Sequence, residues 1–488
     1  MTMTDAGLGR NGNVTVSSPR QYAKTGYCPQ SSIVLLLSAL SCDVVTNETY
    51  NQSEKLDGNR GPGEEVGTMV ERAGAVPFEF IPGGYGWEYL LRAGLYYWNE
   101  GTDKTPGGGN SDLDGAVSKG DVSITLTDAS DYASGDYIQI DTGTHTTEVC
   151  KIDSVTGTPT LTLIDPLNFD HADATTCNEV IAPFTHNFKF NNAAHLESLT
   201  IDKYLGDLFG ERFDGSFINT MSMTGAVDGL ITGNVDVIAA EVKKILADAA
   251  TADSGTTSAT TAGKLTDGAQ SFETTIKKGY LVKNTIDNTY AYVTKVDSDT
   301  ALSLDNDIMA TGETYTIYTN PYFLSSSAIE ALKPTIKENY IFAKSTITID
   351  GASPAGDVVD ATFTVNNNLS AGKAKGSGDN LSRVTTQRGE ITYDFNIVYT
   401  DSTFYDAYRD GDTFAIIDTF EHDSVISGSN TYEMKLTIPK AKIKTAPVPL
   451  TPEELSLAVS CTCQYDSVTE SHFILSIKDN TYQYSYEV

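Results

Sequence analysis

The sequence lacks clustered cysteines, an excess of basic residues and any long apolar run. Its six cysteines form no C-x-x-C pair and its six histidines form no i, i+4 pair, so the clustered ligands of a zinc site are missing. The longest apolar stretch, residues 33–40, is far shorter than the ~20 residues that a membrane-spanning helix needs. We expect no signal peptide, because no basic segment followed by an apolar run opens the sequence.

Basic residues are strongly outnumbered. The chain has 33 Lys and Arg against 65 Asp and Glu, a formal net charge of −32. Such a surface does not hold nucleic acid by its phosphates and does not dock on an anionic membrane. It does not exclude nucleic acid that passes by without being held. With 40% hydrophobic and 20% charged residues, the composition is that of an ordinary soluble globular protein.

Catalytic signatures are also missing. The sequence contains no H-E-x-x-H, no G-x-S-x-G, no Walker A pattern and no G-x-G-x-x-G that opens a helix after a strand. The run Glu421-His422-Asp423 could be an acid–base site, but such runs are more often solvated turns. We therefore predict no catalytic residue, no cofactor site and no metal site, and a protein that is not an enzyme.

Residues 110–121 resemble the first half of a calcium-binding EF-hand loop, with Asn110, Asp112 and Asp114 at alternate positions. The last ligand would be Asp121 rather than a glutamate, and strand-like sequence follows the loop. A structural Asp-rich turn is therefore the preferred interpretation, and calcium binding stays open.

The cysteines are expected to be reduced, buried thiols. Cys461 and Cys463 are two residues apart, a spacing that places both side chains on one face of a strand. A disulfide bridge between Cys150 and Cys177 remains an open alternative.

Two segments of the chain, 126–164 and 265–304, are similar to one another. Gly135 and Gly279 lie 144 residues apart, and so do the runs 151–154 (KIDS) and 295–298 (KVDS). Both segments alternate apolar and polar residues between turn residues, which is typical of short antiparallel strands. We interpret them as two copies of one small β-module, called module 1 (108–182) and module 2 (251–320). Chance similarity between two Thr- and Asp-rich segments is the alternative.

The modules interrupt the rest of the chain. Residues 102–112 and 247–263 are rich in small and turn-forming residues, so we predict flexible linkers there. The remaining pieces, 1–107, 183–250 and 321–488, would then form one discontinuous core domain, called the core.

The core is predicted to be mostly β. Residues 389–399 and 431–438 alternate as strands, with Pro439 expected at a strand end or edge, and 217–223 with 230–238 predict a hairpin. Helices are expected only at 87–95, at 402–411 with Gly411 as C-cap, and at 328–334.

The core pieces resemble the major tail tube protein of long-tailed bacteriophages. The similar features follow one another in the order found in that family: 56–65, 75–95, 195–206, 217–239, 345–370, 388–411 and 434–449. They are patterns of turns, strands and one short helix rather than catalytic signatures, and they leave out both modules.

The resemblance implies a mainly β protein, with a tail-tube-type β-sandwich or barrel core, a short flanking helix and two inserted β-modules on the tube exterior. Similar proteins form hexameric rings that stack into a hollow tube, through which DNA leaves the capsid. The implied partners are other copies of the chain and the tail terminator, distal tail and tape measure proteins, with transient passage of DNA and no membrane. The implied location is the virion tail, after assembly in the host cytoplasm.

Assembly into rings would remove the hazard of an open sheet edge. Two polar segments, 46–71 and the lysine-containing 440–452, are candidate arms that become ordered on assembly. Candidates for carboxylates lining an acidic lumen lie near the predicted hairpin: Asp207, Asp214, Asp228 and Asp236. Negative charge there would repel phosphates within about 8 Å of the wall.

An alternative from another class is an extracellular β-rich adhesin or carbohydrate-binding protein. It predicts exposed aromatic platforms on the modules, formed by Tyr132, Tyr137, Tyr290 and Tyr292. Alternation of these tyrosines more often indicates the interior of a strand pair.

Overall fold

The computed structural model describes most of the chain. The described residues are 12–17, 34–52, 65–98 except 84, 104–118, 121–140, 148–156, 159–163, 167, 170–190, 196–205, 209–246, 251–277, 280–286, 289–304, 307–319, 336–354, 357–372, 383–398, 402–446 and 456–480. The predicted helix at 328–334 lies outside this part, as do Cys28 and Asp207.

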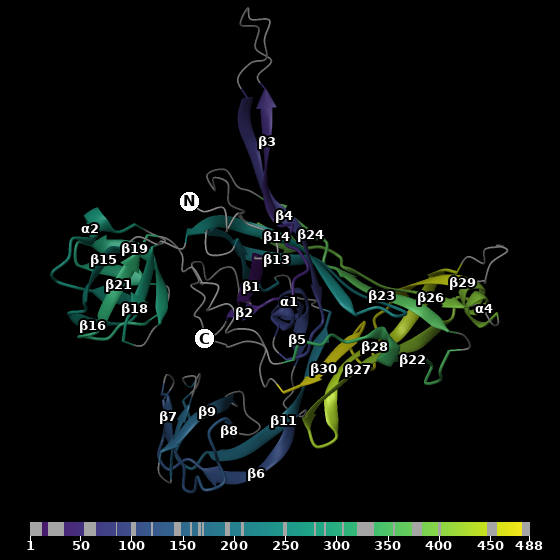
Figure 1. Cartoon of the computed structure of the whole chain (residues 1–488), viewed down its shortest axis with the longest axis horizontal. Coiled ribbons are helices and arrows are strands. Elements are labelled where there is room, and N and C mark those ends of the chain that lie inside the picture. The colour runs from purple at the N-terminus through teal and green to yellow at the C-terminus, as the bar shows by residue number, and fades with distance from the viewer. Residues whose placement is uncertain are drawn as a thin grey trace, which may run out of the picture.

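The protein is mainly β, as predicted, and its strands pair antiparallel (Figure 1). Within the described residues, the largest sheet has 21 strands. They are β1 (Gly12–Ser17), β2 (Val34–Leu36), β3 (Val45–Gln52), β4 (Glu65–Glu79), β5 (Tyr96–Trp98), β6 (Lys104–Asp112), β7 (Ser123–Thr125), β8 (Tyr137–Ile140), β9 (Glu148–Thr156), β10 (Thr160–Leu163), β11 (Thr176–Lys189), β12 (Leu199–Leu205), β13 (Phe209–Ala226), β14 (Thr232–Leu246), β22 (Ser345–Ile349), β23 (Val358–Asn366), β26 (Glu390–Val398), β27 (Thr413–Ser427), β28 (Asn430–Thr445), β29 (Ser456–Cys463) and β30 (Ile474–Asp479).

Module 2 forms a sheet of its own, and a hairpin makes a third. The strands of module 2 are β15 (Thr251–Thr256), β16 (Ala259–Thr261), β17 (Lys264–Thr266), β18 (Leu281–Asn284), β19 (Tyr290–Ser298), β20 (Ala301–Leu304) and β21 (Thr314–Tyr318), and the hairpin pairs β24 (Leu369–Gly372) with β25 (Arg383–Thr386). The described helical segments are α1 (Trp87–Gly94), α2 (Phe272–Thr275), α4 (Thr403–Asp410) and the 3-10 turn η3 (Phe342–Lys344).

The core sheet combines a closed circuit of strands with strands that have an unpaired edge. Its strand pairings run β3–β4–β14–β13–β23–β26–β29–β28–β27–β22. The segment that follows β2 bonds to β4, through the Ala39–Phe78 bridge and the N–H of Leu40 to the carbonyl of Pro77, so β2, β1, β12, β13, β14 and β4 form a closed circuit. Among the described strands, β3 pairs only with β4 and β22 pairs only with β27. The single chain therefore leaves strand edges that another chain could pair with.

Alternation along the strands fills the interior. On β26, Ile391, Tyr393, Phe395 and Ile397 are buried in the main hydrophobic cluster, which confirms the face predicted from the sequence. Helix α1 closes one side of this cluster, since Trp87 is buried and donates its indole N–H to the carbonyl of Ile81 at 2.8 Å.

Two of the three predicted helices are present at the expected residues. Helix α1 starts at Trp87, and α4 ends at Gly411, which has φ 74° in the left-handed region. Glycine reaches this conformation without strain, which explains why the helix stops there.

The expectation that Pro439 ends a strand or lies on an edge is wrong. Pro439 lies inside β28, at a register shift where that strand has one residue more than its neighbour β27. Before the proline β28 also pairs with β30, and after it with β29. Proline has no N–H to donate, so it fits the bulge at which the strand changes partners.

Both predicted linkers contain strands, so that expectation is also wrong. Residues 104–112 form β6, and residues 251–256 form β15. In β6 the carboxylate of Glu179 accepts the N–H groups of Gly108 at 2.7 Å and Gly109 at 2.9 Å. A Cβ on Gly107 would come within 2.4 Å of the same carboxylate, so the glycines serve close packing rather than flexibility.

Modules 1 and 2 share one strand order. Module 1 runs β6–β11–β8–β9–β10–β7, and module 2 runs β15–β21–β18–β19–β20–β17. The prediction that equivalent residues lie 144 positions apart throughout the repeat is wrong for its second half. Tyr137 corresponds to Leu281, 144 residues on, but Ile152 corresponds to Val293, only 141 residues on. The β18–β19 turn is three residues shorter than the β8–β9 turn, so the KIDS and KVDS runs are not structurally equivalent.

Buried cysteines form no bridge among the described residues. Cys150, Cys177, Cys461 and Cys463 are buried free thiols, and Cys42 is partly buried. Strand β8 separates β9, which carries Cys150, from β11, which carries Cys177. Two strand spacings amount to about 9.6 Å, too far for a disulfide, so the Cys150–Cys177 bridge is excluded. Cys461 and Cys463 share the buried face of β29, as predicted.

Candidate assembly surfaces

The core sheet has one face made of polar side chains. It spans the strands β4, β14, β13, β23, β26 and β29. Cross-strand neighbours form three rows: Ala75–Asp236–Thr220–Asn366–Glu390, then Pro77–Asn234–Ser222–Thr364–Thr392–Thr462, and then Glu79–Thr232–Thr224–Thr362–Asp394–Ser460. We call this surface the polar wall. Five strand spacings of ~4.8 Å make it about 24 Å wide.

Charges on the polar wall have one sign. Glu79, Asp236, Glu390 and Asp394 lie in the three rows, and Asp360 lies in the next one, between Ala226 and Asn396. None of these rows contains a lysine or arginine across the six strands; the first cation beyond them is Lys442 on β28, opposite Thr462. The wall therefore presents hydroxyls, amides and carboxylates, with no cation to form an ion pair with a phosphate.

The other face of these strands explains why the polar one stays exposed. Residues that alternate with the wall, such as Val76, Val235, Met221 and Phe363, are buried in the main hydrophobic cluster. Period-2 alternation leaves the remaining side chains on the solvent side, where each wall residue is partly or fully exposed.

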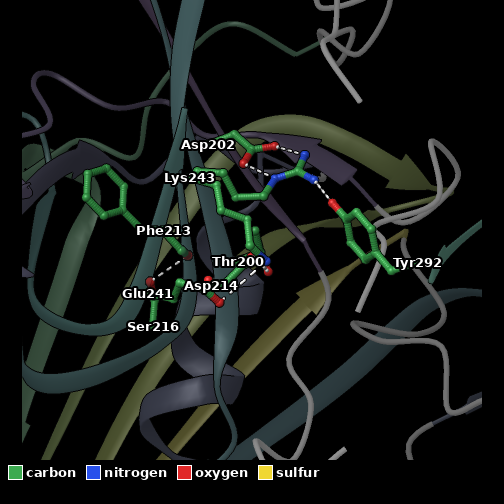
Figure 2. A network of polar contacts seen from close by, with 9 residues as sticks. Thr200, Asp202, Phe213, Asp214, Ser216, Glu241, Lys243 and Tyr292 are labelled. Atoms are coloured by element: carbon green, nitrogen blue, oxygen red, sulfur yellow. Dashed lines mark hydrogen bonds and ion pairs between the residues drawn. The ribbon is translucent and has the colours of Figure 1, made fainter. Parts of the chain in front are cut away.

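Of the four predicted lumen carboxylates, one lies on the wall. Asp236 is in the first row. Asp228 is an exposed turn residue between β13 and β14 with φ 59°, and Asp207 lies outside the described residues. Asp214 is neutralised instead, because it accepts an ion pair from Lys243 at 2.8 Å and a hydrogen bond from Thr200 at 3.1 Å (Figure 2).

Four further acids in the rows of the polar wall and the row beside them lie outside the predicted hairpin: Glu79, Asp360, Glu390 and Asp394. The alternation of β23 and β26 was a usable signal, because both strands place acids and threonines at every second position. What the sequence could not show is that these strands lie beside β13 in one sheet.

The predicted arm at 46–71 already forms strands in the single chain. The prediction that it becomes ordered only on assembly is therefore wrong for its described residues. Strands β3 and β4 pair from Val45–Ala73 to Gln52–Glu65 and project from the body as a hairpin (Figure 1). The second arm, 440–452, begins in strand β28, which contains Lys440, Lys442 and Lys444; residues 447–452 lie outside the described part.

The Glu421-His422-Asp423 run is a strand rather than a turn. It belongs to β27, with Glu421 and Asp423 exposed and His422 buried beside the rings of Tyr340 and Tyr432. Burial lowers the pKa of His422. The side chains of this run point to opposite faces of the strand, so they do not form an acid–base site.

The Asp-rich loop at 110–121 is tied into module 1. Asp112 ends β6, the N–H of Gly115 bonds the carboxylate of Asp173 at 2.7 Å, and Asp121 accepts the N–H of Ser118 at 2.8 Å. Across the described residues, no group of three His, Cys, Asp or Glu side chains is placed to hold a metal ion. Likewise, no helix in that part of the chain is long and apolar enough to cross a membrane.

Aromatic platforms expected of an adhesin are not formed by the described tyrosines. Tyr132 is 6% and Tyr292 3% exposed, and Tyr137 is partly buried against Phe184. The side chain of Tyr290 lies outside the described set. Burial of the Tyr132 and Tyr292 rings contradicts their use as a sugar-binding surface.

One buried carboxyl stands out in the core. Asp418 on β27 is 3% exposed and accepts the hydroxyl of Tyr393 at 2.8 Å. Burial raises the pKa of Asp418 to about 7. It lines a cleft of about 450 Å³ between β22 and β23, which also contains Asp228 and Asp357.

The comparisons with known proteins agree with this architecture. A family model described as phage tail tube protein matches residues 295–461. The match begins in β19 of module 2 and includes three strands of the polar wall, β23, β26 and β29. No curated protein matches the sequence. This family is a class of structural proteins found in the virion tail. Residues 295–461 of this chain are therefore similar to the phage tail tube protein family.

Proposed function

We propose that the chain is a structural subunit of a phage tail tube and forms hexameric rings that stack around a DNA-conducting channel. The polar wall carries this proposal. A channel for DNA needs a hydrophilic lining without cations, because each Lys or Arg at the lumen would bind a phosphate and slow its passage. The three rows of the polar wall carry four carboxylates, Asp360 adds a fifth in the next row, and none of these rows has a cation across the six strands.

Ring closure is supported by the unpaired edges of β3 and β22. A flat, long sheet with unpaired edges is prone to indiscriminate pairing unless another chain covers it. Head-to-tail association that closes by rotation gives each edge one defined partner. The edges at β3 and β22 are available in the single chain, and the β3–β4 hairpin projects from the body, where a neighbouring subunit could pair with it (Figure 1).

The division into the core and two modules supports a decorated tube. Three separate hydrophobic clusters accompany it: one in the core, one around Ile138 and Leu161 in module 1, and one around Val282 and Leu302 in module 2. We place both modules on the tube exterior, away from the polar wall. Partners in the virion would be the tail terminator, distal tail and tape measure proteins, after assembly in the host cytoplasm.

Charge reversal on the wall tests the proposal. Tubes assembled from a chain with Asp236→Lys and Asp394→Lys should retain DNA at low salt, with binding that weakens steeply as salt rises. The matched control is Glu273→Lys with Asp299→Lys, which makes the same charge change at exposed positions of module 2. Electron microscopy of the purified chain first establishes whether tubes form. A strictly monomeric chain, or equal DNA retention inside control tubes, would contradict the proposal.

A further inference from the structure

Module 2 is attached to the core differently from module 1. Strand β11 passes from module 1 into the core, where it pairs with β5 and β30, so both parts share one continuous strand. No described strand of module 2 pairs with a core strand. Its position therefore depends on side-chain contacts.

The contact is centred on Tyr292 of β19. Its hydroxyl accepts the guanidinium N–H of Arg212, with Nη1 2.6 Å from the tyrosine oxygen (Figure 2). Lys243 on β14 lies 5.5 Å from the centre of the same ring, in cation–π range. Tyr292 is 3% exposed and forms a small buried cluster with Leu281, against which Tyr318 packs.

The core side of the contact is a preformed socket. Arg212 is 1% exposed, and its Nε and Nη2 bind the two oxygens of Asp202, each at 2.7 Å. Tyr204 donates a further hydrogen bond to that carboxylate at 3.1 Å. Lys243 is paired with Asp214. Both cations therefore keep a counter-charge when Tyr292 leaves, so separation does not strand a buried charge.

Module 1 shows that the tyrosine is specific to this junction. Lys151 of module 1 occupies the position equivalent to Tyr292 of module 2. Lys151 pairs with Tyr137 on the preceding strand, and Tyr292 pairs with Leu281, which is the residue of module 2 equivalent to Tyr137. Lys151 is exposed and lies 5.6 Å from the ring of Tyr137 in its own module. The same face of the repeat adjoins the core in module 1, where Tyr137 contacts Phe184, but there the shared strand supplies the attachment.

We propose that Tyr292 is a latch, and that module 2 is a hinged domain which separates from the socket of Arg212 and Lys243 as a folded unit. The closed position is the one in Figure 2. The latch includes one hydrogen bond to a charged group and one cation–π contact. Loss of the hydroxyl should therefore raise the open population roughly tenfold to a hundredfold. The proposal does not depend on whether the chain forms a tube.

Cysteine labelling of the full chain tests the latch. Leu281→Cys places a thiol on the docking face, at a side chain that is 1% exposed, and Leu265→Cys places one inside the hydrophobic cluster of module 2, at 0%. Each is made with Tyr292 and with Tyr292→Phe, and mass spectrometry follows labelling at each cysteine. The native Cys177 and Cys461, buried in module 1 and the core, serve as internal references.

With Tyr292→Phe, labelling at position 281 should rise roughly tenfold to a hundredfold, while position 265 and both references stay slow. The exposed Tyr408→Phe is the control that should change nothing. An unchanged rate at position 281, also with Tyr292→Ala, would overturn the latch. A parallel rise at positions 281 and 265 would mean that module 2 unfolds, which overturns its release as a folded unit.

Discussion

Modules 1 and 2 have the same strand order but are held to the core in different ways. Module 1 shares the 14-residue strand β11 with the core, so backbone hydrogen bonds fix its position. Module 2 has its own sheet, and side chains hold it in place. A repeated fold therefore does not determine a repeated attachment. We therefore expect module 1 to unfold together with the core, and module 2 to unfold as an independent unit.

The largest expected effect comes from a cavity made either at the junction between module 1 and the core or in the interior of module 2. Phe184→Ala removes a ring that is 2% exposed at the junction of module 1, and should destabilise module 1 and the core together by about 3–5 kcal/mol. Phe272 is 0% exposed, and Phe272→Ala should lower the free energy of unfolding of module 2 alone by a similar amount. Calorimetry should show one shifted transition in each case. If Phe272→Ala lowered the melting temperature of the core as much as that of module 2, the two would not unfold separately, and the difference between the modules would be contradicted.

Between about pH 5 and 7, a change of pH should act on the core through Asp418, whereas the shifted groups of module 2, Asp297 with a lowered pKa and Tyr315 with a raised pKa, titrate outside this range. Burial raises the pKa of Asp418 to about 7, above the ~3.9 of an unfolded chain. Between these values the folded state holds a proton that the unfolded state has lost. The core should therefore lose stability as pH rises from about 4 to 7, by on the order of 4 kcal/mol, and stay level above. Asp418→Asn should remove this slope in denaturant titrations, whereas a slope that persists would contradict the assignment.

Exchange of equivalent residues sharpens the comparison. Gly255 in β15 corresponds to Ser111 in β6. Gly255 pairs with Tyr315 and Ser111 pairs with Cys177, and Tyr315 and Cys177 occupy equivalent positions in the two modules. A Cβ on Gly255 would lie 2.3 Å from Oδ2 of Asp267 and 2.7 Å from the Tyr315 hydroxyl. Gly255→Ser should therefore destabilise module 2 by about 1–3 kcal/mol, measured by urea unfolding. Ser111→Gly should cost module 1 about 1 kcal/mol, through its lost bonds to Thr127 and Asp128. Equal effects would show that the two sites are interchangeable.

The smallest effect is expected at Lys151. Its cation–π contact with Tyr137 is exposed, so Lys151→Ala should change the stability of module 1 by about 0.5 kcal/mol or less. Hydrogen exchange along β11 should also be unchanged, because the strand rather than the lysine holds the module. Faster exchange confined to β11 would indicate that side chains contribute more than the comparison allows.

Local patterns predicted local structure well. Alternation located β26 and its buried face, and Gly411 marked the end of α4. The glycine-rich composition of 102–112 predicted a flexible linker, and this was wrong. The glycines of β6 accommodate the carboxylate of Glu179, a contact between residues about 70 positions apart. The repeat was found, but its register shifted by three residues at a turn whose length the sequence similarity did not reveal.

The candidate surfaces depended on non-local pairings and were found only in part. Asp236 was predicted because it lies in the hairpin β13–β14, whereas Asp360 and Asp394 come from strands that join the wall more than a hundred residues later in the chain. The socket for Tyr292 combines β12, β13 and β14 with a separate module, and no periodicity brings those residues together.

The central claim is that the polar wall lines the channel of an assembled tube. A cryo-EM reconstruction of tubes formed by the full chain tests this most directly. We expect the strands β4, β14, β13, β23, β26 and β29 around the bore, with Asp236 and Asp394 facing the axis and both modules outside. A reconstruction in which this face meets the exterior or another protein layer, with basic side chains at the bore, would contradict the account.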